Sequence, residues 1–300
     1  MRRFVLALFL AAAAPLGAVA GDTRSVALVV TDAGGAFVPG IRAEEVRVLE
    51  NGEPRELVAF EPDERPLAVV LVLDTSTGAA RVFRGPAFDA VWLFVSRLPS
   101  GSKCTLWTTG DHARKIGVLE GERPAVEKKV AQGFGLDGGN TLLDTLVDAA
   151  ESLGRESDRR RALVAVSGAG AGHTNFSPGD VSSRVRKAAA RVLGVMYREG
   201  ESAGAGSLMG LDTPRDTPNL TMVGAGDHER ILSGLAQGSG GRFESVPAVL
   251  GVSRILGSLA AELGGQYRVR YAATDTKGPR RIEVRLARSG VRWRVAVDTP

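Results

Sequence analysis

The sequence predicts an α/β protein, in which a doubly wound, mostly parallel sheet is joined to a small β unit built from both ends of the chain. Three observations predict this fold. Continuous apolar runs alternate with helical patterns between residues 67 and 265. Shorter segments of alternating polarity, separated by Gly-rich turns, lie on either side of that part. Apolar residues make up 44% of the 300, which is enough for a full core.

Residues 1–20 have the pattern of a secretory signal peptide. Arg2 and Arg3 precede an apolar stretch from Phe4 to Ala14, and Ala18-Val19-Ala20 is typical of a cleavage site. The stretch is shorter than the roughly 20 apolar residues that a membrane span requires, and no later segment is long and apolar enough either. We therefore predict export to the periplasm or the medium, with no membrane span after cleavage.

The charge and the single cysteine narrow the function classes. Loss of Arg2 and Arg3 lowers the Lys and Arg count from 38 to 36 against 34 acids, so the net charge falls from +4 to +2. This small excess does not indicate nucleic-acid binding. Cys104 is the only cysteine, so the chain has no internal disulfide and depends on packing.

Residues 21–66 predict an N-terminal β segment. Alternation at residues 26–30, the apolar stretches 46–49 and 57–60, and an Asn51-Gly52 turn are typical of hairpins. Residues 61–66 are charged, contain two prolines and are interpreted as a linker.

Residues 67–265 predict the α/β unit. The expected strands are 67–73, 104–108, a short one at 116–119, 162–166, 192–196 and 243–246. We expect one helix to begin near Pro86 and the next to be capped by Asn140. The expected buried stripes are Phe88, Val91, Trp92 and Val95; Leu142, Leu143, Leu146, Val147, Ala150 and Leu153; and Leu250, Ile255, Leu256, Leu259 and Leu263. Residues 200–222 are rich in Gly, Ser, Thr and Pro and predict a long loop.

Residues 266–300 predict three further strands, which we expect to form an antiparallel meander that packs with the N-terminal segment. Arginines alternate with apolar residues along these strands, which places them on one solvent face: Arg268, Arg270, Arg285, Arg292 and Arg294. Two interpretations remain open for this face, an acidic partner or a charged edge that prevents aggregation.

Several kinds of catalytic or cofactor site find little support in the sequence. Gly168-Ala-Gly-Ala-Gly172 follows a strand, but a dinucleotide loop needs a third glycine where His173 stands. One cysteine and three scattered histidines do not have zinc-ligand spacing. No G-x-S-x-G elbow occurs, although Ser207 and Ser253 lie close to glycines, so a hydrolase that uses a loop serine remains an alternative.

The stretch LVLDTSTG, residues 71–78, is the best candidate for a site. Asp74 and Ser76 follow a buried strand, at the carboxyl edge where open α/β sheets bind ligands. Thr141, at the start of a later helix, supplies a second hydroxyl. Mg²⁺ prefers such oxygen ligands, but one carboxylate and one hydroxyl from a single loop are only half of a site.

The order of these motifs resembles that of the von Willebrand factor type A domain. The matching stretches are DTSTG, GGNTLLDTL at 138–146 and RALVAVSGAG at 161–170. The flanks, residues 26–61 and 266–297, are similar to those of the VWFA-related family of secreted bacterial proteins. The resemblance implies a metal-ion-dependent adhesion site formed by Asp74, Ser76 and Thr141.

The chain departs from the family pattern at two ligands. Gly78 replaces the second serine, and Gly168 stands where the family has a second aspartate. With one carboxylate left, we expect a degenerate site with no resident cofactor and at most weak Mg²⁺ binding. Asp137 is a candidate replacement ligand. The resemblance implies a non-enzymatic module that binds a protein partner, and a structural accessory of an envelope assembly is a further alternative.

Overall fold

The computed structural model describes residues 22–134, 138–198, 221–274 and 280–296. Three predictions therefore concern residues outside the described ranges. They are the signal peptide at residues 1–20, the candidate ligand Asp137, and the part of the long loop up to residue 220, which contains Ser207. No helix among those that the structure describes has the length and hydropathy to cross a bilayer.

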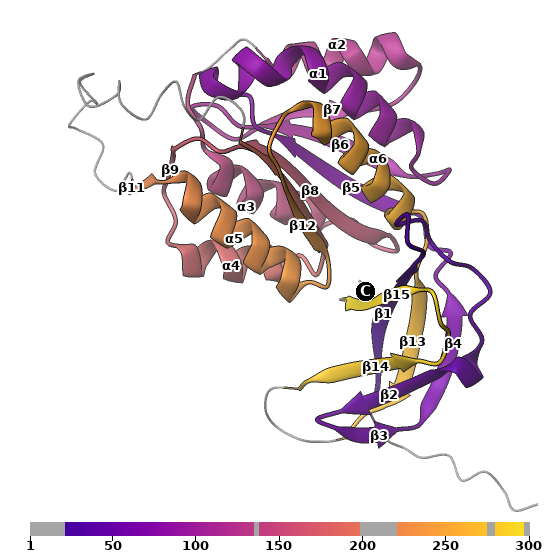
Figure 1. Ribbon diagram of the computed structural model, residues 1–300. Helices are drawn as coiled ribbons and strands as arrows, with labels where there is room; N and C mark the ends of the chain where they lie inside the picture. The colour runs from indigo at the N-terminus through magenta and orange to yellow at the C-terminus, as the bar shows by residue number, and fades with distance from the viewer. Residues whose placement is uncertain (1–21, 135–137, 199–220, 275–279, 297–300) are drawn as a thin grey trace, which may run out of the picture.

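A six-stranded sheet, in the order β12-β10-β8-β5-β6-β7, forms the centre of the α/β unit (Figure 1). Its pairs are parallel except for the edge strand β7, which is antiparallel to β6. The strands are β5 (Leu67–Leu73), β6 (Lys103–Thr108), β7 (Arg114–Val118), β8 (Arg160–Gly168), β10 (Arg191–Tyr197) and β12 (Arg242–Val246). The predicted fold class is confirmed, because residues of β5, β8 and β10 are buried on both faces of the sheet.

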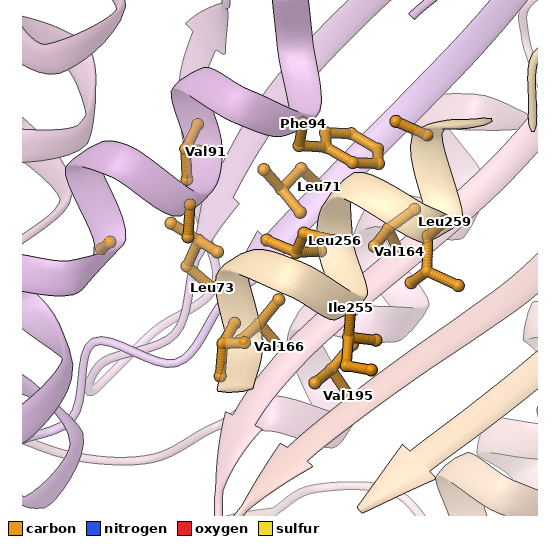
Figure 2. Packing of buried hydrophobic residues seen from close by; sticks show 14 of the residues in the cluster. Leu71, Leu73, Val91, Phe94, Val164, Val166, Val195, Ile255, Leu256 and Leu259 are labelled. Atoms are coloured by element: carbon orange, nitrogen blue, oxygen red, sulfur yellow. The ribbon is translucent and has the colours of Figure 1, made fainter. Parts of the chain in front are cut away.

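Helices cover one face of the sheet with α1 (Thr77–Ser96), α2 (Arg123–Gly133) and α6 (Leu250–Leu263). Figure 2 shows Val91 and Phe94 of α1 and Leu256 of α6 packed over Leu71 of β5. Cys104 of β6 is buried in the same core, and this burial raises the pKa of its thiol to about 12. The protein therefore presents an inert thiol here.

The opposite face is covered by α3 (Leu142–Leu153), α4 (Pro178–Lys187) and α5 (Ala225–Gly238) (Figure 1). The predicted stripe of α3 is fully buried, from Leu142 to Leu153. Two short strands, β9 (Gly172–Thr174) and β11 (Thr221–Val223), pair beside this layer. Helices on both faces confirm the doubly wound arrangement.

Three helix predictions were wrong in detail. Of the stripe predicted for α1 only Val91 is buried, whereas Phe88, Trp92 and Val95 are partly buried beside it. Pro86 lies inside α1 instead of near its start, since the helix begins at Thr77 and the Ser76 side chain caps it by accepting a hydrogen bond from Ala79 N–H. A proline within a helix removes one backbone hydrogen bond, which the burial of this helix against the sheet offsets. Leu250 is 80% exposed because it is the first residue of α6 and faces away from the sheet.

The second unit, here called the β unit, contains both flanks of the chain (Figure 1). Its strands are β1 (Thr23–Thr31), β2 (Val46–Glu50), β3 (Glu53–Arg55), β4 (Leu57–Pro62), β13 (Tyr267–Ala272), β14 (Ile282–Leu286) and β15 (Arg292–Ala296), with a short 3-10 turn at Ala43–Glu45. They form two sheets, β15-β1-β13-β4 and β14-β2-β3. Asn51 and Gly52 both have positive φ, as the predicted hairpin turn requires.

The predicted C-terminal meander is wrong. Instead, β13 lies between β1 and β4, β14 pairs with β2, and β15 pairs with β1. Alternating polarity identifies strands but does not specify their partners. The predicted arginine face is therefore also wrong: Arg285 belongs to a different sheet from Arg270, and Arg294 reaches Glu262 of α6.

Candidate functional site

The candidate site lies where the carboxyl ends of the central strands meet. Asp74 directly follows β5, and its backbone N–H donates to the carbonyl oxygen of Val166 in the neighbouring strand β8, at 2.8 Å. The Asp74 side chain is 1% exposed. Because a buried charge is stable only when polar groups surround it, its partners define what the site can do.

Five donors surround the Asp74 carboxylate. Oδ1 accepts hydrogen bonds from Ser76 N–H at 3.0 Å and from Thr109 Oγ1 at 3.3 Å. Oδ2 accepts from Gly168 N–H at 3.1 Å, Ser167 Oγ at 3.2 Å and Asn140 Nδ2 at 3.5 Å. We call these six residues the Asp74 cluster. The donors come from four segments of the chain, so one carboxylate ties together the loops after β5, β6 and β8 and the start of α3.

The structure adds Thr109, Asn140 and Ser167 to the residues that the sequence suggested. Asn140 has two roles: its Oδ1 accepts from Leu142 N–H at the start of α3, and its Nδ2 reaches Asp74. The predicted cap is displaced by one residue, since Thr141 holds the N-cap position of α3. Thr109 Oγ1 also accepts from Thr75 N–H at 3.1 Å. The available sequence signal for Thr109 and Ser167 is that each is a hydroxyl residue at the carboxyl end of a predicted strand.

Ser76 lies two residues after Asp74 in the chain, and Thr141 directly follows Asn140, which contacts Asp74. The hydroxyl groups of Ser76 and Thr141, however, have other partners. Ser76 Oγ accepts from Ala79 N–H at 3.4 Å. Thr141 Oγ1 lies 3.5 Å from Thr145 Oγ1 within α3. Neither hydroxyl forms a hydrogen bond with the carboxylate. Among the residues that the structure describes, no group of three His, Cys, Asp or Glu side chains is placed to hold a metal ion.

Tyr197 lies beside the position where the family pattern has its second aspartate. In the sheet register, Tyr197 of β10 is directly opposite Gly168 of β8. A Cβ atom added to Gly168 would lie 3.2 Å from both Oη and Cε2 of this ring. By contrast, a Cβ on Gly78 would meet no atom within 4 Å. An aspartate at 168 would thus require Tyr197 to shift, whereas a serine at 78 would not.

Gly138 and Gly139 allow the backbone just before Asn140 to lie close to Thr77 and Asp111. A Cβ on Gly138 would lie 2.6 Å from Thr77 Oγ1, and one on Gly139 would lie 2.5 Å from Asp111 Oδ1. Gly139 N–H donates to that same Asp111 oxygen at 2.9 Å. The glycine pair in GGNTLLDTL therefore has a packing reason, which is the close approach of this loop to two others.

His228, in the first turn of α5, is a buried titratable group near the Asp74 cluster. It is fully buried, and no side chain among the described residues forms a hydrogen bond with either ring nitrogen. Burial lowers its pKa, and the nearby negative charge of Asp74 opposes that shift. Its ring packs against Gly172, where an added Cβ would lie 2.9 Å from His228 Cε1. The folded protein therefore favours the neutral imidazole.

Acidification should destabilise the protein through His228. The unfolded chain takes up this proton near pH 6.5, whereas the folded chain resists it, so stability falls as the pH drops through and below that value. The slope contributed by this residue is at most about 1.4 kcal/mol per pH unit. Urea unfolding between pH 5 and 7 measures the slope. His228→Leu should flatten it, and His112→Gln, at an exposed loop position, should leave it unchanged; an equal slope in all three proteins would contradict the assignment.

The described residues do not form a serine-histidine pair of the kind that a hydrolase uses. Ser253 lies in α6, and the nitrogens of the buried His228 accept no hydroxyl hydrogen bond from any described residue. Ser167, the serine of the Asp74 cluster, has hydrogen bonds to Asp74 Oδ2 and to the carbonyl oxygen of Gly168, at 3.0 Å. Its proton thus has two acceptors, the Asp74 carboxylate and a backbone carbonyl, and no histidine among the described residues forms a hydrogen bond with it.

The sheet order, the helices on both faces and the D-x-S loop at the carboxyl edge together define a von Willebrand factor type A fold. A von Willebrand factor type A structure from Catenulispora acidiphila is 10% identical to the chain, with a TM-score of 0.50, and the match covers 93% of this chain and 72% of that one. Proximal thread matrix protein 1 from the mussel byssus is 13% identical, also with a TM-score of 0.50.

The match to the mussel protein covers 72% of this chain and 51% of the other, so the chain spans about half of the length of that protein. No protein-family model and no curated protein sequence matches the chain. The similarity to solved structures therefore establishes the fold, and function has to be argued from the site itself.

Proposed function

We propose that this protein is an exported, non-enzymatic binding module that holds a protein partner on the loops above the Asp74 cluster, without a bridging metal ion. The observation that carries the proposal is the set of five hydrogen bonds to Asp74, which satisfies both carboxylate oxygens with donors of the chain itself. A divalent cation would have to displace N–H and O–H groups that are already well placed.

The proposed binding surface is the rim of the carboxyl edge, which consists of the exposed residues of the loops around the cluster. These residues are Thr77, Gly78, Asp111, His112, Gly138, Gly170 and Ala171. The Asp74 cluster lies directly beneath and ties these loops to one another, so it holds the rim in one shape. A rigid set of loops on a sheet scaffold favours binding because little conformational entropy is lost on association.

The residues at the positions of the family's metal ligands support binding without a metal ion. One carboxylate remains, Ser76 Oγ caps α1, and Thr141 Oγ1 contacts Thr145. Tyr197 lies next to Gly168, the position at which the family pattern has its second aspartate. Mg²⁺ gives up its hydration water reluctantly and is usually held by one or two carboxylates, so this set of groups favours hydrogen bonding over cation binding.

A pull-down from the envelope fraction of the source cells tests the proposed function. The mature chain should retain a specific protein equally well in EDTA and in millimolar Mg²⁺. A rim variant, His112→Glu with Ala171→Glu, should lose that protein, while Arg285→Glu on β14 of the β unit should retain it. Retention that requires Mg²⁺, or that survives the rim variant unchanged, would contradict the proposal.

Export has its own test, because it rests on residues 1–20 alone. The pattern of two arginines, an apolar stretch and Ala18-Val19-Ala20 supports cleavage after Ala20. N-terminal sequencing of the protein from the envelope fraction or the medium should begin at Gly21. Material in that fraction that still begins with Met1 would rule out cleavage.

A further inference from the structure

A second polar cluster, far along the chain from Asp74, surrounds Glu262 near the end of α6. Glu262 is 1% exposed. Its Oε1 lies 3.6 Å from Nη2 of Arg191, and its Oε2 lies 3.6 Å from Nη1 of Arg242. Arg294 of β15 donates a short hydrogen bond to Oε1. We call these four residues the arginine cluster; it joins the α/β unit to the β unit.

The fold delivers these arginines to one place for simple reasons. Arg191 and Arg242 are the first residues of β10 and β12, which are parallel neighbours and therefore begin at the same edge of the sheet. Strand β15 approaches that edge so closely that a Cβ on Gly240 would lie 2.1 Å from the carbonyl oxygen of Val295. Gly240 also has a φ of +70°, which other residues rarely adopt. Both the close contact with Val295 and this backbone conformation therefore require glycine at position 240.

The cluster contains more positive charge than its carboxylates neutralise. Three arginines face Glu262, and Glu244 adds one further carboxylate at 3.3 Å from Arg242 Nε, so these five side chains carry a net charge of +1. The charge of Arg160 also acts on Arg191 and adds to this positive excess. Glu244 is also the more exposed carboxylate, since 38% of its side chain is accessible. A surplus charge at a buried position is costly unless another group neutralises it.

The donors of the cluster are also unsatisfied. Five buried nitrogens form no hydrogen bond of good geometry with the described residues: Nε, Nη1 and Nη2 of Arg191, Nε of Arg242 and Nε of Arg294. Two of them have an ion-pair contact only, Arg242 Nε with Glu244 at 3.3 Å and Arg191 Nη2 with Glu262 at 3.6 Å. The Arg191 side chain is 5% exposed, and burial lowers its pKa to about 10, with Glu262 opposing the shift and the neighbouring arginines adding to it. Buried guanidinium groups normally have acceptors, so the set points to an additional acceptor.

We propose that Arg191, Arg242 and Arg294 bind a small inorganic anion with a single negative charge, of the size of chloride, beside Glu262. One such ion neutralises the net charge of the cluster and supplies an acceptor for guanidinium N–H groups from both units. The bound ion links β10 and β12 to β15 and thereby stabilises the attachment of the β unit to the α/β unit. This site is independent of the rim and of the proposed protein partner.

Thermal unfolding of the full mature chain in sodium chloride and in sodium gluconate, at constant ionic strength, tests the proposal. Replacement of gluconate, a bulky organic anion, by chloride should raise the unfolding temperature, and the rise should continue with the logarithm of the chloride concentration. Once the chloride concentration exceeds the dissociation constant, each tenfold increase should raise the ratio of folded to unfolded protein about tenfold. Identical curves in the two salts would overturn the proposal.

Matched variants separate this site from general salt effects. Arg191→Met and Arg294→Met should each abolish the chloride dependence; the second variant changes a side chain that is 34% exposed and guards against failure of the first to fold. Arg285→Met, on the exposed Arg285–Glu283 pair, should keep the dependence. A chloride dependence of the unfolding temperature that persists in both cluster variants would overturn the proposal. A chain that ends at Ala296 is the second comparison: a chloride dependence that this shortened chain shows and the full mature chain lacks would also overturn the proposal.

Discussion

Replacement of Asp74 by alanine is expected to lower the free energy of unfolding by about 3–5 kcal/mol, because several buried donors would lose a charged acceptor together. Asp74→Asn should also be strongly destabilising, since an amide NH₂ would face N–H and O–H donors in place of a carboxylate oxygen. Urea unfolding, followed by the fluorescence of Trp92 and Trp107 in the α/β unit, measures both effects.

The matched control for this prediction is Asp89→Ala on α1. Asp89 pairs with Arg123, but its side chain is 70% exposed, and exposed pairs contribute little. This variant should change the free energy of unfolding by less than about 1 kcal/mol. A loss of similar size in the Asp74 and Asp89 variants would show that the Asp74 hydrogen bonds do not hold the loops together.

Deletion of residues 266–300 is expected to unfold the N-terminal strands. Strand β13 pairs with both β1 and β4, β15 pairs with β1, and β14 pairs with β2, so the deletion leaves the β2–β3 hairpin without a sheet. It also removes Tyr267, whose ring stacks on Phe60 at 4.8 Å and whose hydroxyl accepts from Ile41 N–H at 3.0 Å.

Hydrogen exchange measured by mass spectrometry reports this loss segment by segment. Residues 26–60 should exchange at rates close to those of an unfolded chain, whereas β5 and β8 should remain protected. A chain that ends at Ala296 keeps every pairing strand and serves as the control. Unchanged protection of residues 26–60 after the long deletion would contradict the idea that the two ends of the chain form one folding unit.

The central sheet was predictable from sequence because its strands are buried on both faces. An apolar run such as Leu67–Leu73 has no polar residue to obscure its limits, so the predicted and observed bounds agree. The β unit was harder to predict. Its strands alternate in polarity, which reveals a strand and its buried face, but the pairing of β13 between β1 and β4 depends on contacts across more than 200 residues.

Part of the candidate site was also predictable. The position of Asp74 after an apolar strand, and the likeness of the motif order to a type A domain, indicated where the site lies. The partners of Asp74 could not be derived in this way, because Thr109 and Ser167 come close only when β6 and β8 flank β5. Tyr197 beside Gly168 follows from the register of β8 and β10, which a sequence pattern does not specify.

Glu262 and its three arginines show the same limit. Arg294 looked like one of several exposed arginines on alternating strands, and Arg191 and Arg242 were simply residues at the starts of strands. The sequence contains no local signal that joins them, since the contacts arise from the packing of β15 against the strand-start edge of the central sheet. Long-range ion pairs of this kind are accessible only from the three-dimensional structure.

Calorimetric titration of Mg²⁺ and Mn²⁺ into the metal-free mature protein tests the central claim most directly, namely that the Asp74 carboxylate is held by hydrogen bonds of the chain and not by a cation. We expect no saturable binding heat for either cation in the millimolar range. The native protein and the Asp74→Asn variant should differ in stability but not in metal binding. Saturable binding by the native protein that Asp74→Asn abolishes would contradict the claim and would show that Asp74 remains a metal ligand.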